Sequence, residues 1–344
     1  MDGGDMAIVD RSVKEAKGWS GYIPVAAGVG SALLLLGLLS GVTYAVVVST
    51  GVLVGALLLR LFRRKPALFW WRPDSRDLIV VGVLYVAVVG FIRLAFVGFT
   101  TGSMVGLFIS YAVLGMLLLG VAAPVLYNVR IRHRPLRSLG VGLHDWRPTL
   151  ALGLVFAGLQ FALTLWGYDL PRPVDWIPLL LMSLTVGLFE SIFFRGFIQN
   201  RLEASFGPVL GVGLVAALYG LYHFGYGMGS EEIVFLAGLG VVYAVAFRAT
   251  RNMLILWPLL TPLGSLFNNL EAGDIVLPWA SMAGFGQVLA AMGVVLWIAH
   301  RYWKRLPEVT MTEVFEYETP NLDKREIVVS AGSRSASPGN TDRR

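Results

Sequence analysis

The chain has 344 residues, of which 56% are hydrophobic and only 15% are charged, and its net charge is +6. This composition excludes an ordinary soluble domain, and the absence of cysteine excludes disulfides, thiolate metal ligands and a cysteine nucleophile. The lysines and arginines gather between long apolar blocks, so the positive charge indicates membrane topology and no nucleic-acid partner.

The apolar residues form blocks of about 17–25 residues, the length that crosses a hydrocarbon core as an α-helix. The short alternating segments that are typical of membrane β-barrels are not visible. We therefore predict an all-α, polytopic helical membrane protein with about ten transmembrane helices. The expected spans are residues 22–41, 44–61, 78–99, 104–127, 148–167, 175–199, 207–223, 232–248, 253–270 and 278–299.

The connections between these spans alternate in charge. Basic residues follow the even-numbered spans, at residues 60–65, 130–134, 201, 248–251 and 301–305, whereas the opposite connections are poor in them. The positive-inside rule then predicts that both termini are cytoplasmic. We expect a multi-pass protein of the cell (plasma) membrane, with membrane lipid around it.

Five segments follow from this pattern. We predict a cytoplasmic N-terminal segment (1–21), a four-helix membrane region (22–128), a basic cytoplasmic linker (129–147), a second membrane domain (148–300) and a disordered cytoplasmic tail (301–344). The second membrane domain carries the polar residues that are unusual within apolar spans.

Glu190 and Arg195 stand inside an otherwise apolar span. A charged side chain at the bilayer centre costs roughly 2.5–3.5 kcal/mol on insertion scales, so such a residue marks a functional site by default. The alternative is a structural carboxylate paired with Arg93 or Arg195. Downstream, Tyr219 precedes His223 by one helical turn, and a glutamate with a histidine can activate a water molecule.

The ninth expected span contains two prolines, Gly264 and Ser265, and it ends in Asn268 and Asn269. Proline and glycine weaken a membrane helix, and the backbone groups that they free need partners from protein or water. Asparagine side chains can donate hydrogen bonds to a developing oxyanion. The groups needed for hydrolysis of an amide by water are therefore largely present.

The order Glu-x-x-x-x-Arg, then aromatic-x-x-x-His, then a helix ending in asparagine, resembles the CAAX-protease and bacteriocin-processing (CPBP, or Abi) family of intramembrane endopeptidases. The resemblance covers roughly residues 148–300 and implies a CAAX-protease-like helical bundle around a cavity in the membrane. It implies that Glu190 activates water, that His223 is its partner and that Asn269 supports the oxyanion. Supporting positions in the same motifs are Ser191, Arg195, Tyr219, Ser265 and Asn268.

Two positions depart from the family's motifs. Ser191 stands where the family has a second glutamate, and Ser265 stands four residues before Asn269, where the third motif has a histidine. With so few potential ligands, we expect no metal and no other cofactor. Some members of that family remove the C-terminal tripeptide from prenylated proteins, and others bind partner membrane proteins.

The predicted activity is glutamate-dependent hydrolysis of a peptide bond in a membrane-associated protein or peptide, near the cytoplasmic side. The alternative is a catalytically degenerate member that acts as a membrane scaffold or binds a partner. A transporter is the third possibility, and the lack of an inverted repeat disfavours it.

The expected spans leave one geometric question open. Glu190 lies toward the cytoplasmic end of its span, whereas His223 lies toward the opposite end of the next one. At a rise of about 1.5 Å per residue, short straight helices would hold the two residues far apart. They can meet if the sixth span continues past Arg195 toward Arg201, or if the seventh span enters late or tilts.

Overall fold

The computed structural model describes residues 74–98, 104–143, 146–165, 168–272 and 277–305. In these residues the regular structure is helical throughout, which confirms the predicted all-α class. Within these described ranges, six stretches are long and apolar enough to cross a membrane: Ser75–Gly98, Met104–Ile131, Pro173–Tyr226, Ser230–Thr250, Met253–Leu270 and Ser281–Trp303. This supports a multi-pass membrane protein, while the choice of membrane and the orientation of the termini stay predictions.

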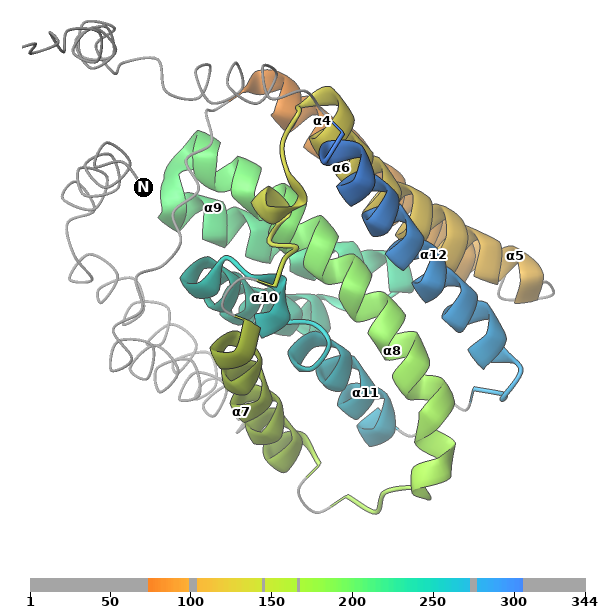
Figure 1. Ribbon diagram of the computed structural model, residues 1–344. Helices are drawn as coiled ribbons and strands as arrows, with labels where there is room; N and C mark the ends of the chain where they lie inside the picture. The colour runs from red at the N-terminus through yellow and green to blue at the C-terminus, as the bar shows by residue number, and fades with distance from the viewer. Residues whose placement is uncertain (1–73, 99–103, 144–145, 166–167, 273–276, 306–344) are drawn as a thin grey trace, which may run out of the picture. The chain divides into compact units, whose positions relative to one another are not determined.

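The exact number of spans also stays a prediction. The expected spans at 22–41 and 44–61 lie outside the described residues, as do the segment 1–21 and the tail beyond residue 305. The principal helices are α4 (Ser75–Arg93), α5 (Met104–Phe108), α6 (Ala123–Leu126), α7 (Trp146–Thr164), α8 (Trp176–Glu190), α9 (Asn200–Tyr222), α10 (Ser230–Thr250), α11 (Leu260–Ala272) and α12 (Ser281–Trp303) (Figure 1).

Wider, π-helical turns join several of these helices into longer rods. The segments η3 (Ile109–Ala122) and η4 (Tyr127–Ile131) make α5 and α6 one rod, and η7 (Ser191–Gln199) joins α8 to α9. Shorter 3₁₀ turns lie at η5 (Leu136–Leu139), η8 (His223–Tyr226) and η9 (Met253–Ile255). Glu190, the last residue of α8, therefore lies within a helix that continues well beyond Arg195.

A glycine turn at Gly207 interrupts α9. Its backbone angles, φ 81° and ψ 170°, lie in a region that is essentially restricted to glycine, and Pro208 follows directly. The chain reverses there, so the second part of α9 returns beside η7 (Figure 1). About as many residues separate Glu190 from Gly207 as separate Gly207 from His223. The open geometric question is thus answered by the first route, a sixth span that continues past Arg195.

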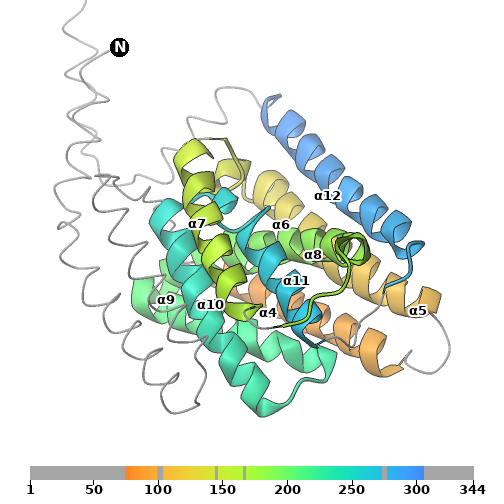
Figure 2. The same cartoon turned by 90° about the horizontal axis from the view of Figure 1, so that it is seen from below.

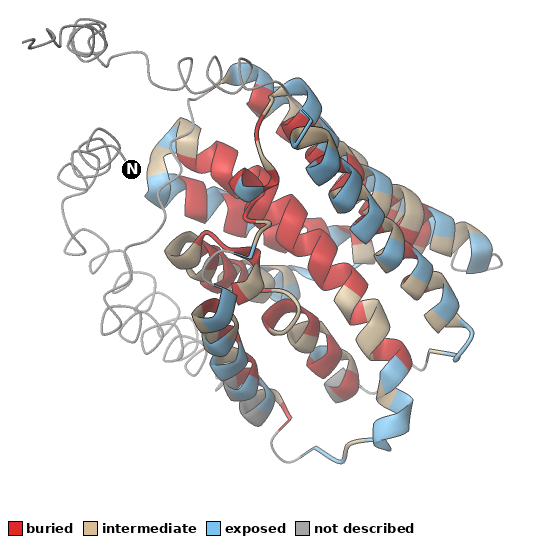
Figure 3. Cartoon of the chain, in the orientation of Figure 1, coloured by how far each residue is buried: buried red, intermediate tan, exposed pale blue. Residues whose placement is uncertain are grey.

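The core of the bundle surrounds α8 and η7. Buried residues concentrate along this rod and the adjoining parts of α9, as Figure 3 shows. The rod lies between α12 and α11, which both pack against it (Figure 2). One hydrophobic cluster extends from Val81 on α4 to Ala299 on α12, so the described parts of the two predicted membrane regions share a core.

The outer faces of the helices are apolar instead of polar. Ile79, Val83 and Val86 on α4 are each more than 60% exposed, and Val294 and Trp297 on α12 are more than half exposed. In a soluble protein such side chains would face water at a cost. Their position is that of lipid-facing residues, in agreement with a multi-pass membrane protein.

One end of the bundle carries a buried ionic network, which we name the arginine network. Asp77, on the first turn of α4, is 3% exposed and accepts a hydrogen bond from the Tyr127 hydroxyl at 2.7 Å. Its carboxylate lies 3.3 Å from Arg132 Nε, 3.3 Å from Arg134 Nη1 and 3.6 Å from Arg201 Nε.

Glu203 on α9 anchors the second half of the arginine network. Its carboxylate forms ion pairs with Arg248 and Arg251, at the end of α10. Arg251 Nη1 also donates to Asn200 Oδ1 at 2.6 Å. Asn200 Nδ2 in turn donates to the Ser138 carbonyl at 2.9 Å. The arginine network therefore ties α4, the segment around η5, α9 and α10 together at the same end of the bundle.

Candidate active site

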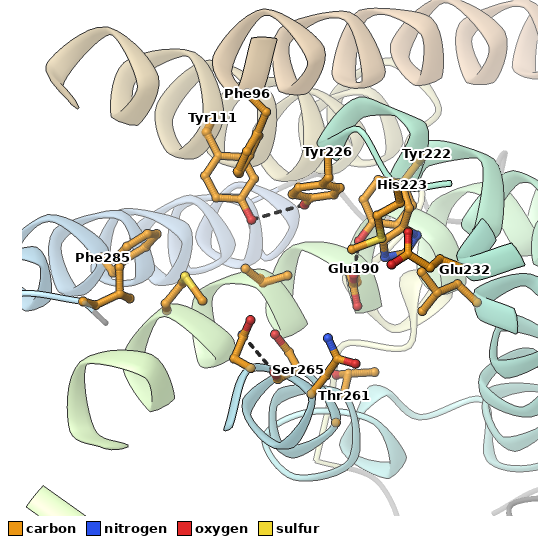
Figure 4. A pocket seen from close by; sticks show the side chains of 18 of the residues that line it. Phe96, Tyr111, Glu190, Tyr222, His223, Tyr226, Glu232, Thr261, Ser265 and Phe285 are labelled. Atoms are coloured by element: carbon orange, nitrogen blue, oxygen red, sulfur yellow. Dashed lines mark hydrogen bonds between the residues drawn. The ribbon is translucent and has the colours of Figure 1, made fainter. Parts of the chain in front are cut away.

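A cavity of about 2230 Å³ opens within the bundle and reaches Glu190. Residues from the α5–η3 rod, α7, α8, the end of α9, α10, α11 and α12 line it (Figure 4). Six of the eight residues that the sequence singles out are among them: Glu190, Tyr219, His223, Ser265, Asn268 and Asn269. The structure thus brings all three predicted catalytic residues to one cavity, whereas Ser191 and Arg195 do not line it.

Glu190 is held by two tyrosines of α9. The Tyr222 hydroxyl donates a hydrogen bond to Oε1, and the Tyr219 hydroxyl donates to Oε2 at 3.2 Å. The side chain is nearly buried, at 7% exposure. Because each carboxylate oxygen has two lone pairs, an acceptor position on each oxygen remains after these bonds. A buried carboxylate is costly without hydrogen-bond donors, and the two tyrosines supply them.

In the part of the chain that the structure describes, neither Arg93 nor Arg195 forms a direct ion pair with Glu190. Arg93 donates to the Phe224 carbonyl at 3.2 Å and lies over the Phe224 ring. Arg195 lies over the Tyr219 ring, 4.9 Å from its centroid. Among the described residues, neither arginine approaches the Glu190 carboxylate within ion-pair distance.

His223 has a fixed tautomer. Its Nδ1 lies 2.8 Å from the carbonyl oxygen of Tyr219. Since a carbonyl only accepts, Nδ1 carries the hydrogen and Nε2 of the neutral ring keeps a lone pair. The ring packs against Tyr222 with centroids 4.0 Å apart. Glu190, Tyr222 and His223 all line the cavity, and Figure 4 shows them close together.

The facing wall is formed by polar residues of α11. Thr261, Ser265, Asn268 and Asn269 share one side of this helix because they are spaced three or four residues apart. Asn269 Nδ2 donates to the Ser265 carbonyl at 2.9 Å, so part of its donor capacity is used within α11. Ser265 accepts a hydrogen bond from Ser183 of α8 at 3.4 Å. Figure 4 shows Thr261 and Ser265 across the cavity from Tyr111 and Tyr226.

Arg195 and Ser191 support the site from behind. Arg195 is 1% exposed, and within the described ranges its Nη1 and Nη2 have no hydrogen-bond partner. Its guanidinium lies over the rings of Tyr219 and Tyr243. Such cation–π contacts favour the charged guanidinium in a desolvated position. Ser191 Oγ lies 3.4 Å from Thr261 Oγ1 and links η7 to α11.

Tyr222 is a residue of this site that the sequence does not single out. It follows Tyr219 by three residues and directly precedes His223. Residues three apart share a helix face, so the signal was present in the spacing. Within the described ranges, no three His, Asp or Glu side chains lie close enough to hold one metal ion.

The comparison with protein families agrees with this site. A family model described as Rce1-like, type II CAAX prenyl endopeptidase, matches residues 172–260. The match contains Glu190, Tyr219, Tyr222 and His223, while Ser265, Asn268 and Asn269 follow it in the chain. No curated protein and no solved structure matches the chain. Residues 172–260 are thus similar to the Rce1-like type II CAAX prenyl endopeptidases, which confirms the resemblance to the CPBP family that the motifs indicate.

Proposed function

We propose that the protein is a CAAX-protease-like intramembrane endopeptidase that hydrolyses a peptide bond of a membrane-associated protein or peptide. One observation carries the proposal: the Glu190 carboxylate and His223 line the same cavity, with His223 Nδ1 engaged by a carbonyl and Nε2 left as an acceptor. Two acceptors in one cavity can take the two hydrogens of a single water molecule.

The chemistry follows from these acceptors. A water oxygen attacks the scissile carbonyl carbon while Glu190 accepts the proton that the water loses, and His223 holds the second hydrogen. Hydrogen-bond donors on α11, from Asn269, Asn268 or Ser265, would stabilise the oxyanion that forms. Collapse of the tetrahedral intermediate then breaks the C–N bond, and the proton held by Glu190 goes to the leaving amine.

The rest of the cavity supports an apolar substrate. Phe96, Phe108, Met182 and Phe285 are among the side chains that line it around the polar wall. Ligand cavities combine such apolar linings with a few polar groups that fix orientation. The lining therefore favours a membrane-associated protein or peptide over a polar, freely diffusing one.

The first prediction tests the glutamate. Glu190→Gln preserves the shape of the side chain but cannot accept a proton, so we expect cleavage to fall about 10²- to 10⁴-fold. The purified protein, reconstituted in nanodiscs, is incubated with a library of apolar peptides, and cleavage is read by mass spectrometry. Glu231→Gln is the matched control, because Glu231 also lines the cavity but lies at the start of α10. Equal cleavage by wild type and Glu190→Gln would refute the mechanism.

A second candidate function is a membrane scaffold that binds a partner without cutting. It is favoured by the two tyrosines, which satisfy Glu190 without any water, and by serine at two motif positions. For such a scaffold, neither the wild type nor Glu190→Gln cleaves peptides, and partners recovered by crosslinking are the same for both.

A further inference from the structure

We propose that the cavity opens on the extracytoplasmic side of the membrane, so that the substrate is a segment presented on that side. That the cavity binds a substrate rests on the proposed function, whereas the side of the membrane on which the cavity opens does not depend on catalysis. This inference replaces the expectation, drawn from sequence, of hydrolysis near the cytoplasmic side.

The mouth of the cavity lies at helix ends remote from the arginine network. The helix α10 begins at Ser230, which lines the cavity, and ends beside Arg248 and Arg251 in the arginine network. Several other helices place their corresponding ends at the mouth. The residues concerned are Met104 at the start of α5, Tyr168 after α7, Asn269 near the end of α11 and Ser281 at the start of α12.

Glu190 forms the floor of the cavity. No residue between Ser191 and Leu218 lines it, although this stretch of η7 and α9 leads from Glu190 to the arginine network and back. Buried aromatic rings fill the space behind the floor instead. Phe189, Phe193, Phe194 and Phe197 are 0% exposed. Phe193 stacks with Phe189 and Phe197, so a buried aromatic layer lies between the floor of the cavity and the arginine network.

The charges at the two ends set the orientation. The arginine-network end carries five arginines of the network, and Arg130, Arg137 and Arg301 belong to segments at the same end. At the mouth end, the basic residues within the described ranges are Arg93 and Arg172, and the cavity lining contains Glu231 and Glu232 with neither lysine nor arginine. Because lysine and arginine near span ends are retained in the cytoplasm, the arginine network faces the cytoplasm and the mouth faces away from it.

The absence of cysteine makes a direct test possible, because a single introduced cysteine is then the only thiol in the chain. Three variants are labelled with a membrane-impermeant maleimide in intact cells or spheroplasts, then after permeabilisation, then in detergent. Ser230→Cys reports on the mouth, Ser265→Cys reports on the cavity wall, and Arg137→Cys is the control at the arginine-network end. Ser230 and Arg137 are both exposed.

We expect Ser230→Cys and Ser265→Cys to be labelled before permeabilisation and Arg137→Cys only after it. The proposal is overturned if Ser230→Cys needs permeabilisation, because the mouth then faces the cytoplasm. It is also overturned if Ser265→Cys reacts only after permeabilisation or only in detergent, because the cavity is then closed to the outer face. Adding Glu190→Gln to each variant leaves the labelling unchanged, so a failure of the proposed catalysis is distinguishable from a failure of this inference.

Discussion

At the scale of single residues, Tyr222 links the carboxylate to the histidine. Its hydroxyl bonds Glu190, its ring packs on His223, and it is 1% exposed. Hydrogen bonds to charged groups contribute about 1.5–3 kcal/mol. A buried carboxylate therefore depends strongly on such a donor to stay charged and in place, and a general base has to be charged to take a proton.

Tyr222→Phe is accordingly expected to lower peptide cleavage about ten- to a hundredfold, mainly in kcat, because a charged hydrogen bond of this size is lost. The peptide assay with purified protein in nanodiscs measures kcat and KM. Tyr111→Phe is the matched control, since Tyr111 lines the same cavity and its hydroxyl pairs with the Tyr226 hydroxyl at 3.2 Å instead of with Glu190. Equal losses in both variants would show that the hydrogen bond to Glu190 is not the specific contribution of the Tyr222 hydroxyl.

Residue order alone predicts much of the candidate site. Glu190, His223 and Asn269 could be singled out because ionisable or amide groups are rare in apolar spans, and the structure places all three at one cavity. Their catalytic roles stay predictions. The two tyrosine hydrogen bonds could not be predicted, because they depend on how far α9 returns along η7. The sequence allows Arg195 as a partner for Glu190, whereas in the structure the guanidinium lies over the Tyr219 and Tyr243 rings.

At the scale of elements, the reversal at Gly207 determines whether α9 returns to the depth of Glu190. Gly207→Ala is expected to destabilise the protein by about 1–3 kcal/mol, because a Cβ makes this backbone conformation unfavourable. No atom lies within 4 Å of the added Cβ, so strain and not crowding is the cause. Thermal unfolding in detergent measures the change.

Gly213→Ala in the same helix is the control for that experiment. Gly213 has open space around it and an ordinary φ, so alanine there is expected to be neutral or to stabilise the helix by up to about 1 kcal/mol. If both alanine variants behave alike, the turn conformation does not control stability.

The sequence predicts the existence of these elements better than their ends. The sixth span is expected at residues 175–199, and the sequence leaves its continuation through Gln199-Asn200-Arg201 open. In the structure the helix continues through it, because Gln199 donates to the Ala244 carbonyl at 2.8 Å and Asn200 to the Ser138 carbonyl. Partners from distant segments satisfy these side chains, and a single sequence does not reveal such partners.

At the scale of the whole bundle, the arginine network and the proposed catalytic residues lie at different depths. The arginine network fixes the ends of α4, α9 and α10, and the aromatic layer behind Glu190 separates it from the cavity. A buried ion pair contributes little net stability, but removing one partner leaves the other charge without compensation. The network is therefore sensitive to the loss of a single acid.

Asp77→Asn tests this sensitivity. The variant leaves three arginines around a neutral amide, and breaking a buried ion pair typically costs about 3–5 kcal/mol. Asp175→Asn is the control, because Asp175 pairs with Arg172 at 3.3 Å on an exposed surface, where a pair contributes about 0–1 kcal/mol. Thermal unfolding of both variants in the same detergent should show a large loss for Asp77→Asn and almost none for Asp175→Asn. Comparable decreases in melting temperature for the two variants would mean that water reaches the arginine network and that this end of the bundle is not sealed.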